Sequence, residues 1–397
     1  MWEFDVCVVG GCGHVGLPLG LVFADRGLRV AIHDLNDRAV ALVRGGSMPF
    51  LEQGAGPVLR DVLERGLVVA NDPTLAARSR FVVVVIGTPV DEHLNPTFHV
   101  MKDLFRALLP HLSDGQCVIL RSTVYPGTTR KVHEILRKSG KAIELAFCPE
   151  RVAEGKAMKE LVELPQLVSG CSNEATRMAS ELFGKIARQI FVMSPEEAEV
   201  VKIFANVWRY IQFATANQFF MIATDKGLDY YRIHDALTRD YPRMAGLPRP
   251  GFAAGPCLFK DTMQLAAAAE HHFSLGHSAM LINEGLPEFV VKHMKARFPL
   301  SDMTVGILGM AFKADSDDPR ESLSYKLRKV LDYEAGAVLC TDPYIEGAGF
   351  LPVDEVLGRS DALIVGTPHS VYRGLVLPEG KPVIDVWDFF GKGANLT

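Results

Sequence analysis

The 397-residue chain has no apolar run long enough to cross a bilayer, because its longest hydrophobic blocks, such as Phe81–Ile86, are strand-sized. Asp5–Gly10 already has the pattern of a buried strand, and no basic segment precedes it, so we expect no signal peptide. A net charge of −5 gives no sign of a polyanion-binding surface. These absences predict a protein with neither a nucleic-acid partner nor a membrane partner.

The cysteine pattern gives no sign of disulfide bonds or of a metal site. The seven cysteines are an odd number and lack the spacing of a disulfide framework. The sequence contains no CxxC pair and no Cys/His cluster, so we predict no metal site. Reduced thiols are typical of the cytoplasm, which is where we expect the protein to be.

What the sequence does contain is an alternation of short apolar runs with amphipathic stretches. This alternation is typical of β-α-β units and a parallel sheet. It breaks off in the middle of the chain and resumes near Met303. The sequence therefore predicts an α/β fold with two Rossmann-like doubly wound domains, residues 1–193 and 301–397, joined by a central helical region, residues 194–300. The predicted strands are Asp5–Val9, Arg29–His33, Phe81–Ile86, Cys117–Arg121, Leu145–Cys148, Thr304–Gly309, Ala337–Thr341, Ala362–Val365 and Val383–Val386.

The central region should contain one long helix. Ser194–Glu197 supplies an N-cap serine, a proline at the first helical position and a capping-box glutamate. No glycine or proline follows until Gly227, so we predict a helix of about 30 residues, roughly 45 Å long. Because the segment is rich in Phe, Val, Ile and Trp, we expect most of its circumference to be buried.

A dinucleotide-binding fingerprint follows the first strand. Gly11, Gly13 and Gly16 form GxGxxG between a strand and an apolar helix, where they allow a tight turn, approach of a pyrophosphate and close helix packing. Asp34 ends the next strand, where a carboxylate accepts from the ribose 2′-hydroxyl and repels a 2′-phosphate. The pattern favours NAD over NADP. The alternative is an ordinary glycine-rich turn beside a surface aspartate, with no bound cofactor.

A second motif surrounds Cys257. Pro256 precedes it, which places Cys257 near a helix N-terminus, where the helix dipole and Lys260 favour the thiolate. Asp261 follows and is suited to positioning or deprotonating a water. A buried cysteine is usually only a small hydrophobe. The glycine-rich loop before Cys257 and the Lys-Asp pair after it favour a nucleophile.

Lys202 and Asn206 lie four residues apart on the long predicted helix and share one face. In a largely apolar helix they are suited to form a polar stripe that points into a site. An ordinary solvated face is an equally good interpretation of these two residues alone.

These elements, in this order, resemble the UDP-glucose/GDP-mannose dehydrogenase family over essentially the whole chain. The resemblance implies an N-terminal NAD domain, a central region that forms a homodimer through the long helix, and a C-terminal domain that binds a UDP-sugar, with a role in polysaccharide biosynthesis. Further family-like motifs are Gly87-Thr88-Pro89, Ser122-Thr123-Val124, Pro126-Gly127-Thr128, Pro149–Gly155, Gly309-x-Ala311-Phe312-Lys313 and Asp318-x-Arg320-Glu321-Ser322.

The resemblance also implies roles for single residues. It implies that Cys257 is the nucleophile of a four-electron oxidation of the sugar C6 alcohol to the acid, through a thiohemiacetal and a thioester. The implied catalytic residues are Cys257, Lys202, Asn206, Asp261, Thr123 and Glu150. The implied NAD contacts are Gly11, Gly13, Val15, Gly16, Asp34, Thr88, Thr123 and Glu154. The implied substrate contacts are Glu150, Arg151, Val152, Lys202, Asn206, Arg243, Phe252 and Lys313, with Arg243 reaching the sugar site of a neighbouring subunit.

Three positions depart from the family pattern. Ala254-Gly255 stands where Gly-Gly is usual, and Trp387 stands in a stretch where an arginine is common. Arg151 follows Glu150 where UDP-glucose enzymes usually carry an aromatic residue, so the chain looks closer to the branch that acts on UDP-N-acetylhexosamines such as UDP-ManNAc or UDP-GlcNAc. UDP-glucose is the alternative substrate.

Two other functions fit part of the sequence. A two-electron β-hydroxyacid dehydrogenase shares the GxGxxG domain and the catalytic lysine, but it needs neither Cys257 nor a second sheet domain. A non-catalytic nucleotide-sugar sensor keeps the fold and loses catalytic groups, whereas Cys257, Lys202 and Asp261 are all present. The number of NAD molecules reduced per sugar separates the three functions.

Overall fold

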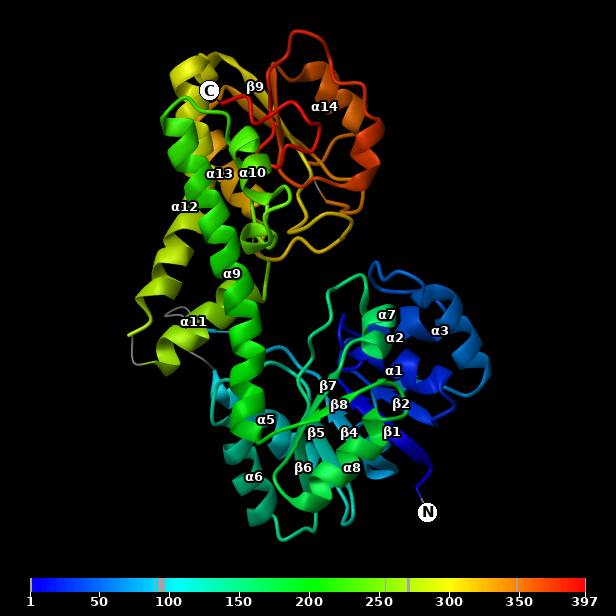
Figure 1. The fold of residues 1–397 in the computed structure, drawn as a ribbon. Helices are drawn as coiled ribbons and strands as arrows, with labels where there is room; N and C mark the ends of the chain where they lie inside the picture. Colours follow the sequence, from blue (N-terminus) through cyan, green and yellow to red (C-terminus); the bar gives the residue numbers. More distant parts are fainter. Residues whose placement is uncertain are drawn as a thin grey trace. The chain divides into compact units, whose positions relative to one another are not determined.

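The computed structural model describes residues 2–88, 90–91, 97–253, 255–269, 272–347 and 349–396. The chain divides into two compact units, Met1–Ala205 (unit 1) and Asn206–Thr397 (unit 2). Each unit contains a sheet flanked by helices, mainly parallel in unit 1 and wholly parallel in unit 2 (Figure 1). The fold is therefore α/β with two Rossmann-like domains, as the sequence predicts.

Unit 1 is built on a sheet with the strand order β3-β2-β1-β4-β5-β6-β7-β8. All neighbouring strands are parallel except β6 and β7. The order reverses between β1 and β4, and such a switch point opens a crevice at the carboxyl ends of the strands. The strands are β1 Phe4–Val9, β2 Val30–His33, β3 Val68–Ala70, β4 Ser79–Val84, β5 Cys117–Leu120, β6 Glu144–Phe147, β7 Gln166–Gly170 and β8 Ile190–Val192.

The helices of unit 1 form the two outer layers of its doubly wound fold (Figure 1). They are α1 Gly16–Asp25, α2 Asp37–Arg44, α3 Ala55–Glu64, α4 Thr74–Ala77, α5 Phe98–Leu108, α6 Thr128–Lys138, α7 Ala157–Glu163 and α8 Asn173–Phe183.

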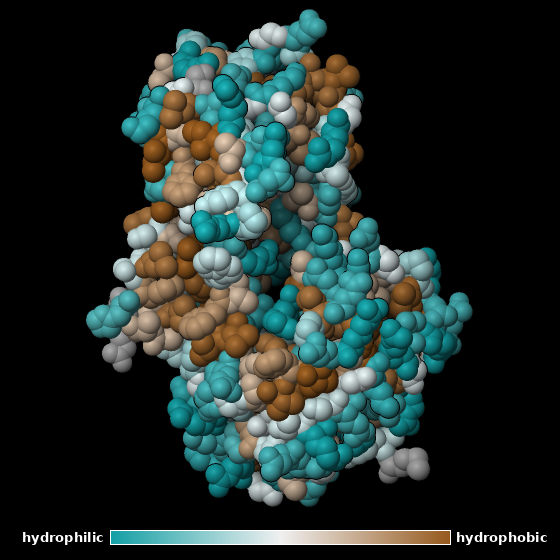
Figure 2. Space-filling view, in the orientation of Figure 1, coloured by the Kyte–Doolittle hydropathy of each residue, from teal (hydrophilic) through white to brown (hydrophobic). Residues whose placement is uncertain are grey.

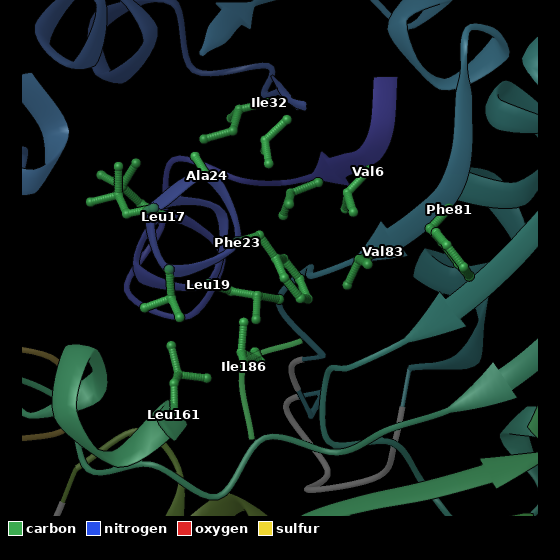
Figure 3. Packing of buried hydrophobic residues seen from close by; sticks show 14 of the residues in the cluster. Val6, Leu17, Leu19, Phe23, Ala24, Ile32, Phe81, Val83, Leu161 and Ile186 are labelled. Atoms are coloured by element: carbon green, nitrogen blue, oxygen red, sulfur yellow. The ribbon is translucent and has the colours of Figure 1, made fainter. Parts of the chain in front are cut away.

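Helix α1 is the centre of the core on one face of this sheet. Every residue of α1 from Gly16 to Ala24 is buried. Leu17, Leu19 and Phe23 are completely inaccessible and pack among the strand and helix side chains drawn in Figure 3. Because α1 follows the glycine loop directly, this packing fixes the loop against the sheet.

Unit 2 contains the second sheet, with the order β10-β9-β11-β12 and parallel pairing throughout. The long helix α9, Pro195–Asp225, begins in unit 1 and continues into unit 2. The other elements of unit 2 are α10 Tyr230–Thr238, α11 Leu258–Ala268, α12 Ser274–Arg297, β9 Thr304–Leu308, α13 Leu323–Glu334, β10 Ala337–Thr341, α14 Val353–Arg359, β11 Ala362–Val365 and β12 Val383–Ile384.

Helix α9 begins as the sequence predicts. The side chain of Glu197 accepts from the backbone N–H of Ser194 at 2.8 Å, and the Glu197 N–H donates to the Ser194 hydroxyl at 3.3 Å. This reciprocal capping box satisfies N–H groups that the first helical turn leaves unpaired. The helix has 31 residues, in agreement with the predicted length.

The prediction that most of the α9 circumference is buried is wrong for this chain by itself. Phe204, Trp208, Phe219 and Ile222 are 55, 61, 41 and 46% exposed. Their spacing returns them to one face of the helix. Figure 2 shows hydrophobic side chains at the surface over the central helices. The composition identifies these residues as apolar, but it does not indicate whether the same chain or another chain covers them.

All predicted strands are present, and their observed ends differ from the predicted ends by at most two residues. Strands β3, β7 and β8 were not predicted. Both β3 and β8 have only three residues, and β7 runs antiparallel to its neighbour β6, so these strands break the repeating β-α pattern. Among the helices of the described residues, none is long and apolar enough to cross a membrane.

Candidate active site

The loop between β1 and α1 has the shape that a dinucleotide needs. A Cβ on Gly11 would lie 2.7 Å from Ile32, and a Cβ on Gly16 would lie 2.7 Å from the Gly11 backbone. A Cβ on Gly13 would meet nothing within 4 Å. Gly11 and Gly16 therefore allow the tight turn and the helix packing, whereas Gly13 leaves open space where a pyrophosphate can approach. Val15 lies next to them at the start of α1.

Asp34 lies at the end of β2, as predicted, and is tied to this loop. One carboxylate oxygen accepts from the Cys12 N–H at 2.9 Å, and the other accepts from the Asn36 N–H at 2.9 Å. The side chain is only partly buried. A carboxylate has about four acceptor sites, so Asp34 retains capacity for a ribose hydroxyl.

A second carboxylate joins the glycine loop from a distant part of the chain. Glu154 lies 3.2 Å from Nδ1 of His14, and the His14 ring packs on Phe50 with 4.0 Å between the ring centroids. The predicted NAD contact Glu154 therefore lies beside the glycine loop that contains Gly13. His14 was not predicted, because it occupies a variable position of GxGxxG. Phe50 was not predicted either, because it lies outside the motif.

The loops after β4 and β5 also meet. The Thr88 hydroxyl donates to the Thr123 carbonyl at 2.5 Å, and the Ser122 hydroxyl accepts from the Ile86 N–H at 2.8 Å. Thr88 and Thr123 thus lie together at the carboxyl ends of neighbouring strands, where ligands of doubly wound sheets bind. Pro89, which completes the predicted Gly-Thr-Pro motif, lies outside the described residues.

Glu150 follows β6 and is buried, with 8% exposure. It forms an ion pair with Arg121, which is 1% exposed. Its other oxygen accepts from the N–H groups of Arg151 and Val152 at 2.6 and 2.8 Å. Three of its roughly four acceptor sites are therefore used inside unit 1, which leaves room for about one further donor such as a water. Arg121 was not predicted, because it occupies a strand-end position in an apolar run.

Arg151 is half-buried, and its guanidinium donates to the Pro165 carbonyl. Burial lowers the pKa of Arg151, and the charge of Glu150 opposes this effect. Guanidinium has five N–H donors, so the Pro165 contact leaves several of them for a ligand.

Helix α9 is anchored to the Thr123 loop by a residue that was also not predicted. Glu199 is 1% exposed and accepts from the N–H groups of Gly127 and Thr129 at 2.6 and 2.7 Å. Its carboxylate thereby caps the N-terminus of α6, although burial raises its pKa. Lys202 lies one turn further along α9 and is partly buried.

In unit 2, Cys257 stands at the N-cap position of α11 and is exposed. Asp261, one turn into α11, is completely buried. It accepts from the Asn206 amide at 2.6 Å and lies 3.1 Å from the Lys260 ammonium. Asn206 is only 6% exposed, which excludes a solvated face for this residue. The structure therefore brings the Asn206 side chain of α9 to Asp261, which lies one turn after Cys257 in α11.

The loop that precedes Cys257 is shaped by two aromatic rings. A Cβ on Gly251 would lie 2.2 Å from the Trp387 ring, and a Cβ on Gly255 would lie 2.5 Å from the Phe312 ring. Gly255 also has φ +108°, a conformation that favours glycine. Of the Gly-Gly pair that is usual in the family, this sequence therefore keeps Gly255, the glycine that the fold requires. Ala254, where the sequence departs from the pattern, lies outside the described residues.

The remaining predicted substrate contacts differ in exposure. Phe252 is 2% exposed and belongs to the hydrophobic core of unit 2, so its side chain has little surface to offer a ligand. Arg243 is exposed beside the Tyr241 ring. Lys313 is partly buried, and its ammonium lies 5.6 Å from the centroid of the neighbouring Phe312 ring.

Three family models match successive parts of the chain. Residues 4–190 match the NAD binding domain of the UDP-glucose/GDP-mannose dehydrogenase family, residues 196–285 match its central domain, and residues 306–392 match its UDP binding domain. The chain thus contains the NAD-binding domain that the glycine loop predicts.

Individual relatives agree with this match. A UDP-N-acetyl-D-mannosamine dehydrogenase of Methanococcus aeolicus is 30% identical over 95% of this chain and 87% of its own length. A solved structure of UDP-D-ManNAc dehydrogenase from Pyrococcus horikoshii is 27% identical, with a TM-score of 0.89 over 99% of this chain and 96% of that one. A UDP-glucose dehydrogenase from Pyrobaculum islandicum is 25% identical, with a TM-score of 0.88 over 96% and 94%. The chain belongs to the UDP-glucose/GDP-mannose dehydrogenase family and is an NAD-dependent nucleotide-sugar dehydrogenase.

Proposed function

We propose that this enzyme oxidises the C6 alcohol of a UDP-N-acetylhexosamine to the carboxylate, with Cys257 as the covalent nucleophile. The observation that carries the proposal is the exposed Cys257 at the N-terminus of α11, followed one turn later by the buried Asp261–Asn206 pair. A helix N-terminus stabilises a thiolate, and a reactive cysteine must also be accessible.

The conversion of an alcohol to an acid removes four electrons as two hydrides and takes up one water. NAD, when bound, would supply the hydride acceptor for each oxidation, so the reaction requires two NAD per sugar. Between the two oxidations the Cys257 thiolate adds to the C6 aldehyde and forms a thiohemiacetal. Loss of the second hydride gives a thioester, and water cleaves its C–S bond to release the acid and return the thiol.

Asn206 is well placed to stabilise the oxyanions of this sequence. One of its amide N–H groups donates to Asp261, and an amide has a second N–H to offer. Loss of one oxyanion donor typically reduces the rate about 100- to 1000-fold. We assign Lys202 as a second donor. Asp261 orients Asn206 and holds a water, and the general base of the first oxidation is either Asp261 through that water or Lys202.

The residues that hold NAD in this proposal are those gathered in unit 1. The open space at Gly13 admits the pyrophosphate, and Asp34 accepts from the adenosine ribose. Thr88, Thr123 and Glu154 complete the site, and Glu150 holds the hydrolytic water with the acceptor site that its partners leave.

The choice of an N-acetyl sugar rests on two kinds of support. The relatives from Methanococcus aeolicus and Pyrococcus horikoshii are both named for UDP-N-acetyl-D-mannosamine. In addition, Arg151 has donors for an acetamido carbonyl, and one charged hydrogen bond gives about 10- to 150-fold discrimination. The Pyrobaculum islandicum structure is nearly as similar and is named for UDP-glucose, so fold similarity does not separate the two sugars.

We further propose the predicted domain division, with an NAD domain at residues 1–193, a dimerisation region at 194–300 and a UDP-sugar domain at 301–397. The exposed apolar face of α9, formed by Phe204, Trp208, Phe219 and Ile222, supports a homodimer through this helix. All seven cysteines lie in the described ranges and none forms a disulfide, which supports a cytoplasmic location.

One experiment tests the substrate. The kcat/KM values for UDP-ManNAc, UDP-GlcNAc and UDP-glucose are measured by NADH formation in wild type and Arg151→Ala. We expect an N-acetyl sugar to be preferred in wild type and the preference to fall in the variant. A wild-type preference for UDP-glucose would exclude the proposed sugar. A preference that survives Arg151→Ala would keep the sugar and remove Arg151 as its determinant.

A further inference from the structure

The second sheet contains a buried histidine–aspartate pair that the proposed chemistry does not use. His369 follows β11 and Asp342 follows β10, and both side chains are 0% exposed. Nε2 of His369 lies 3.1 Å from an Asp342 carboxylate oxygen. The rings of Tyr344 and Tyr372 pack edge-on against the imidazole, at 5.1 and 5.6 Å between centroids. A fully enclosed polar pair must be satisfied by its own surroundings.

The surroundings fix the tautomer of His369. Its Nδ1 lies 3.0 Å from the backbone N–H of Asp315, and a backbone N–H can only donate. Nδ1 is therefore the acceptor, and Nε2 carries the proton that is donated to Asp342. Each ring nitrogen thus holds a different loop.

Asp342 gathers the loops at the carboxyl ends of two neighbouring strands. One oxygen accepts from the N–H groups of Met310 and Ala311, after β9, at 2.6 and 3.0 Å. The other accepts from the N–H groups of Tyr344 and Ile345, after β10, at 2.9 and 3.1 Å. With the bond from His369, this carboxylate accepts five hydrogen bonds from three loops.

The link between His369 and Asp315 is reinforced in the opposite direction. The Asp315 carboxylate accepts from both the N–H and the hydroxyl of Ser370, each at 2.8 Å. Asp315 has φ +56°, in the left-handed region that non-glycine residues adopt only when their surroundings require it. The loop from Gly309 to Asp315 is therefore held at both ends, by Asp342 at Met310 and by His369 at Asp315.

This loop carries Phe312 and Lys313 and reaches the nucleophile. The Phe312 ring lies against Gly255, where it leaves no room for a Cβ, and Gly255 is two residues before Cys257. On the other side of this contact, the Gly255 N–H donates to the Glu321 carbonyl at 3.2 Å. A displacement of the Gly309–Asp315 loop would therefore move both the predicted substrate lysine and the support of the cysteine loop.

We infer that His369 and Asp342 are positioning residues for the reaction: together they hold the Gly309–Asp315 loop so that Lys313 faces the nucleotide-sugar and Phe312 supports the Cys257 loop. The inference rests on the proposed function of this site. Both side chains are fully enclosed, and the residues assigned to NAD lie in unit 1.

The two ring nitrogens can be tested separately, because an asparagine amide resembles Nδ1 and a glutamine amide resembles Nε2. His369→Asn keeps an acceptor for the Asp315 N–H, and His369→Gln keeps a donor for Asp342. We expect His369→Gln to raise the KM for the UDP-sugar and the Kd for UDP about 10-fold, because it removes the acceptor of the Asp315 N–H, and one neutral hydrogen bond at the upper end of its range corresponds to about that factor. His369→Asn should have a smaller effect on both constants, and the KM for NAD should not change in either variant.

The matched control is His293→Gln, the same substitution in a second histidine–aspartate contact of unit 2, the His293–Asp225 pair at 3.0 Å. It should leave all three constants unchanged. Ser370→Ala tests the same loop without altering the imidazole, in case the His369 variants fail to fold. If wild type neither binds UDP nor oxidises any UDP-sugar, the proposed function fails. If wild type does both and His369→Gln and Ser370→Ala change only thermal stability, the positioning role is overturned.

Discussion

The two sheet domains place an aspartate at the same point of their topology and use it in opposite ways. In both units an aspartate directly follows the second strand, and its carboxylate accepts from the backbone of the loop that follows the first strand. In unit 1, Asp34 accepts one such N–H, from Cys12, and is only partly buried. In unit 2, Asp342 accepts two, from Met310 and Ala311, and is completely enclosed. One carboxylate keeps capacity for a ligand, and the other is fully occupied by its own protein.

Both loops begin with a crowded glycine, since a Cβ on Gly10 would lie 2.0 Å from the Val85 carbonyl, but only the first loop continues with an open one. A Cβ on Gly13 would meet nothing within 4 Å, whereas a Cβ on Gly309 would lie 2.4 Å from the Thr367 carbonyl. The first loop is open where a pyrophosphate must approach, and the second is closed by the strand-end loop of β11. A shared α/β topology therefore does not imply a shared ligand.

The largest expected effects come from filling the two glycine positions. Gly309→Ala should lower the free energy of unfolding by about 3 kcal/mol, because φ +90° is strained for alanine and the Thr367 carbonyl occupies the space. Gly13→Val should leave stability nearly unchanged and raise the KM for NAD by about two orders of magnitude. Denaturant unfolding and NAD kinetics on both variants check the contrast. A Gly13→Val enzyme with normal NAD kinetics would show that this loop does not receive the cofactor.

The next effect concerns acid stability. Burial alone would raise the pKa of Asp342, but the hydrogen bond from His369 and those from the backbone donors hold that pKa below its ordinary value of 3.8. A lowered pKa in the folded state stabilises the protein above pH 3.8, and this contribution is lost as the pH falls from 3.8 through the folded pKa. Asp342→Asn should remove this part of the pH dependence.

The measurement for Asp342→Asn is hydrogen exchange of the peptides that contain Met310 and Tyr344, as a function of pH. In wild type these amides should lose protection steeply below pH 3.8, and in the variant they should be less protected at neutral pH and lose less on acidification. Equal pH dependence in both proteins would mean that the Asp342 carboxylate does not control the loops.

The smallest expected effect is on cofactor choice. Asp34→Ser removes the carboxylate that accepts from the ribose and repels a 2′-phosphate, so the preference for NAD over NADP should fall about 10-fold. The ratio of kcat/KM for the two cofactors measures it. The paired variant Asp342→Asn should leave this ratio unchanged, and an unchanged ratio in Asp34→Ser would place the ribose elsewhere.

The sequence predicts those features that are written in local patterns. The capping box at Ser194, the glycine loop and the N-cap position of Cys257 each depend on residues within a few positions of one another. The residues that the sequence does not reveal act across long separations. Asp342 binds a loop 32 residues earlier, and Arg121 pairs with Glu150 29 residues later. Nothing near these residues in the sequence indicates which loop the fold will bring to them.

The exposed face of α9 illustrates a second limit. Its hydrophobic side chains predict burial, but Trp208 is 61% exposed in the single chain. Local composition records that a surface must be covered, and it does not distinguish cover by the same chain from cover by a second copy.

The most direct test of the account is the stoichiometry and product of a single substrate. Wild type and Cys257→Ser are incubated with limiting UDP-ManNAc and excess NAD, and NADH and the uronic acid are quantified. We expect wild type to form about two NADH and one acid per sugar, since the aldehyde is captured on Cys257 and oxidised again. Cys257→Ser should form no acid while it still binds NAD. One NADH per sugar in wild type, or acid formation by Cys257→Ser at the wild-type rate, would contradict the mechanism.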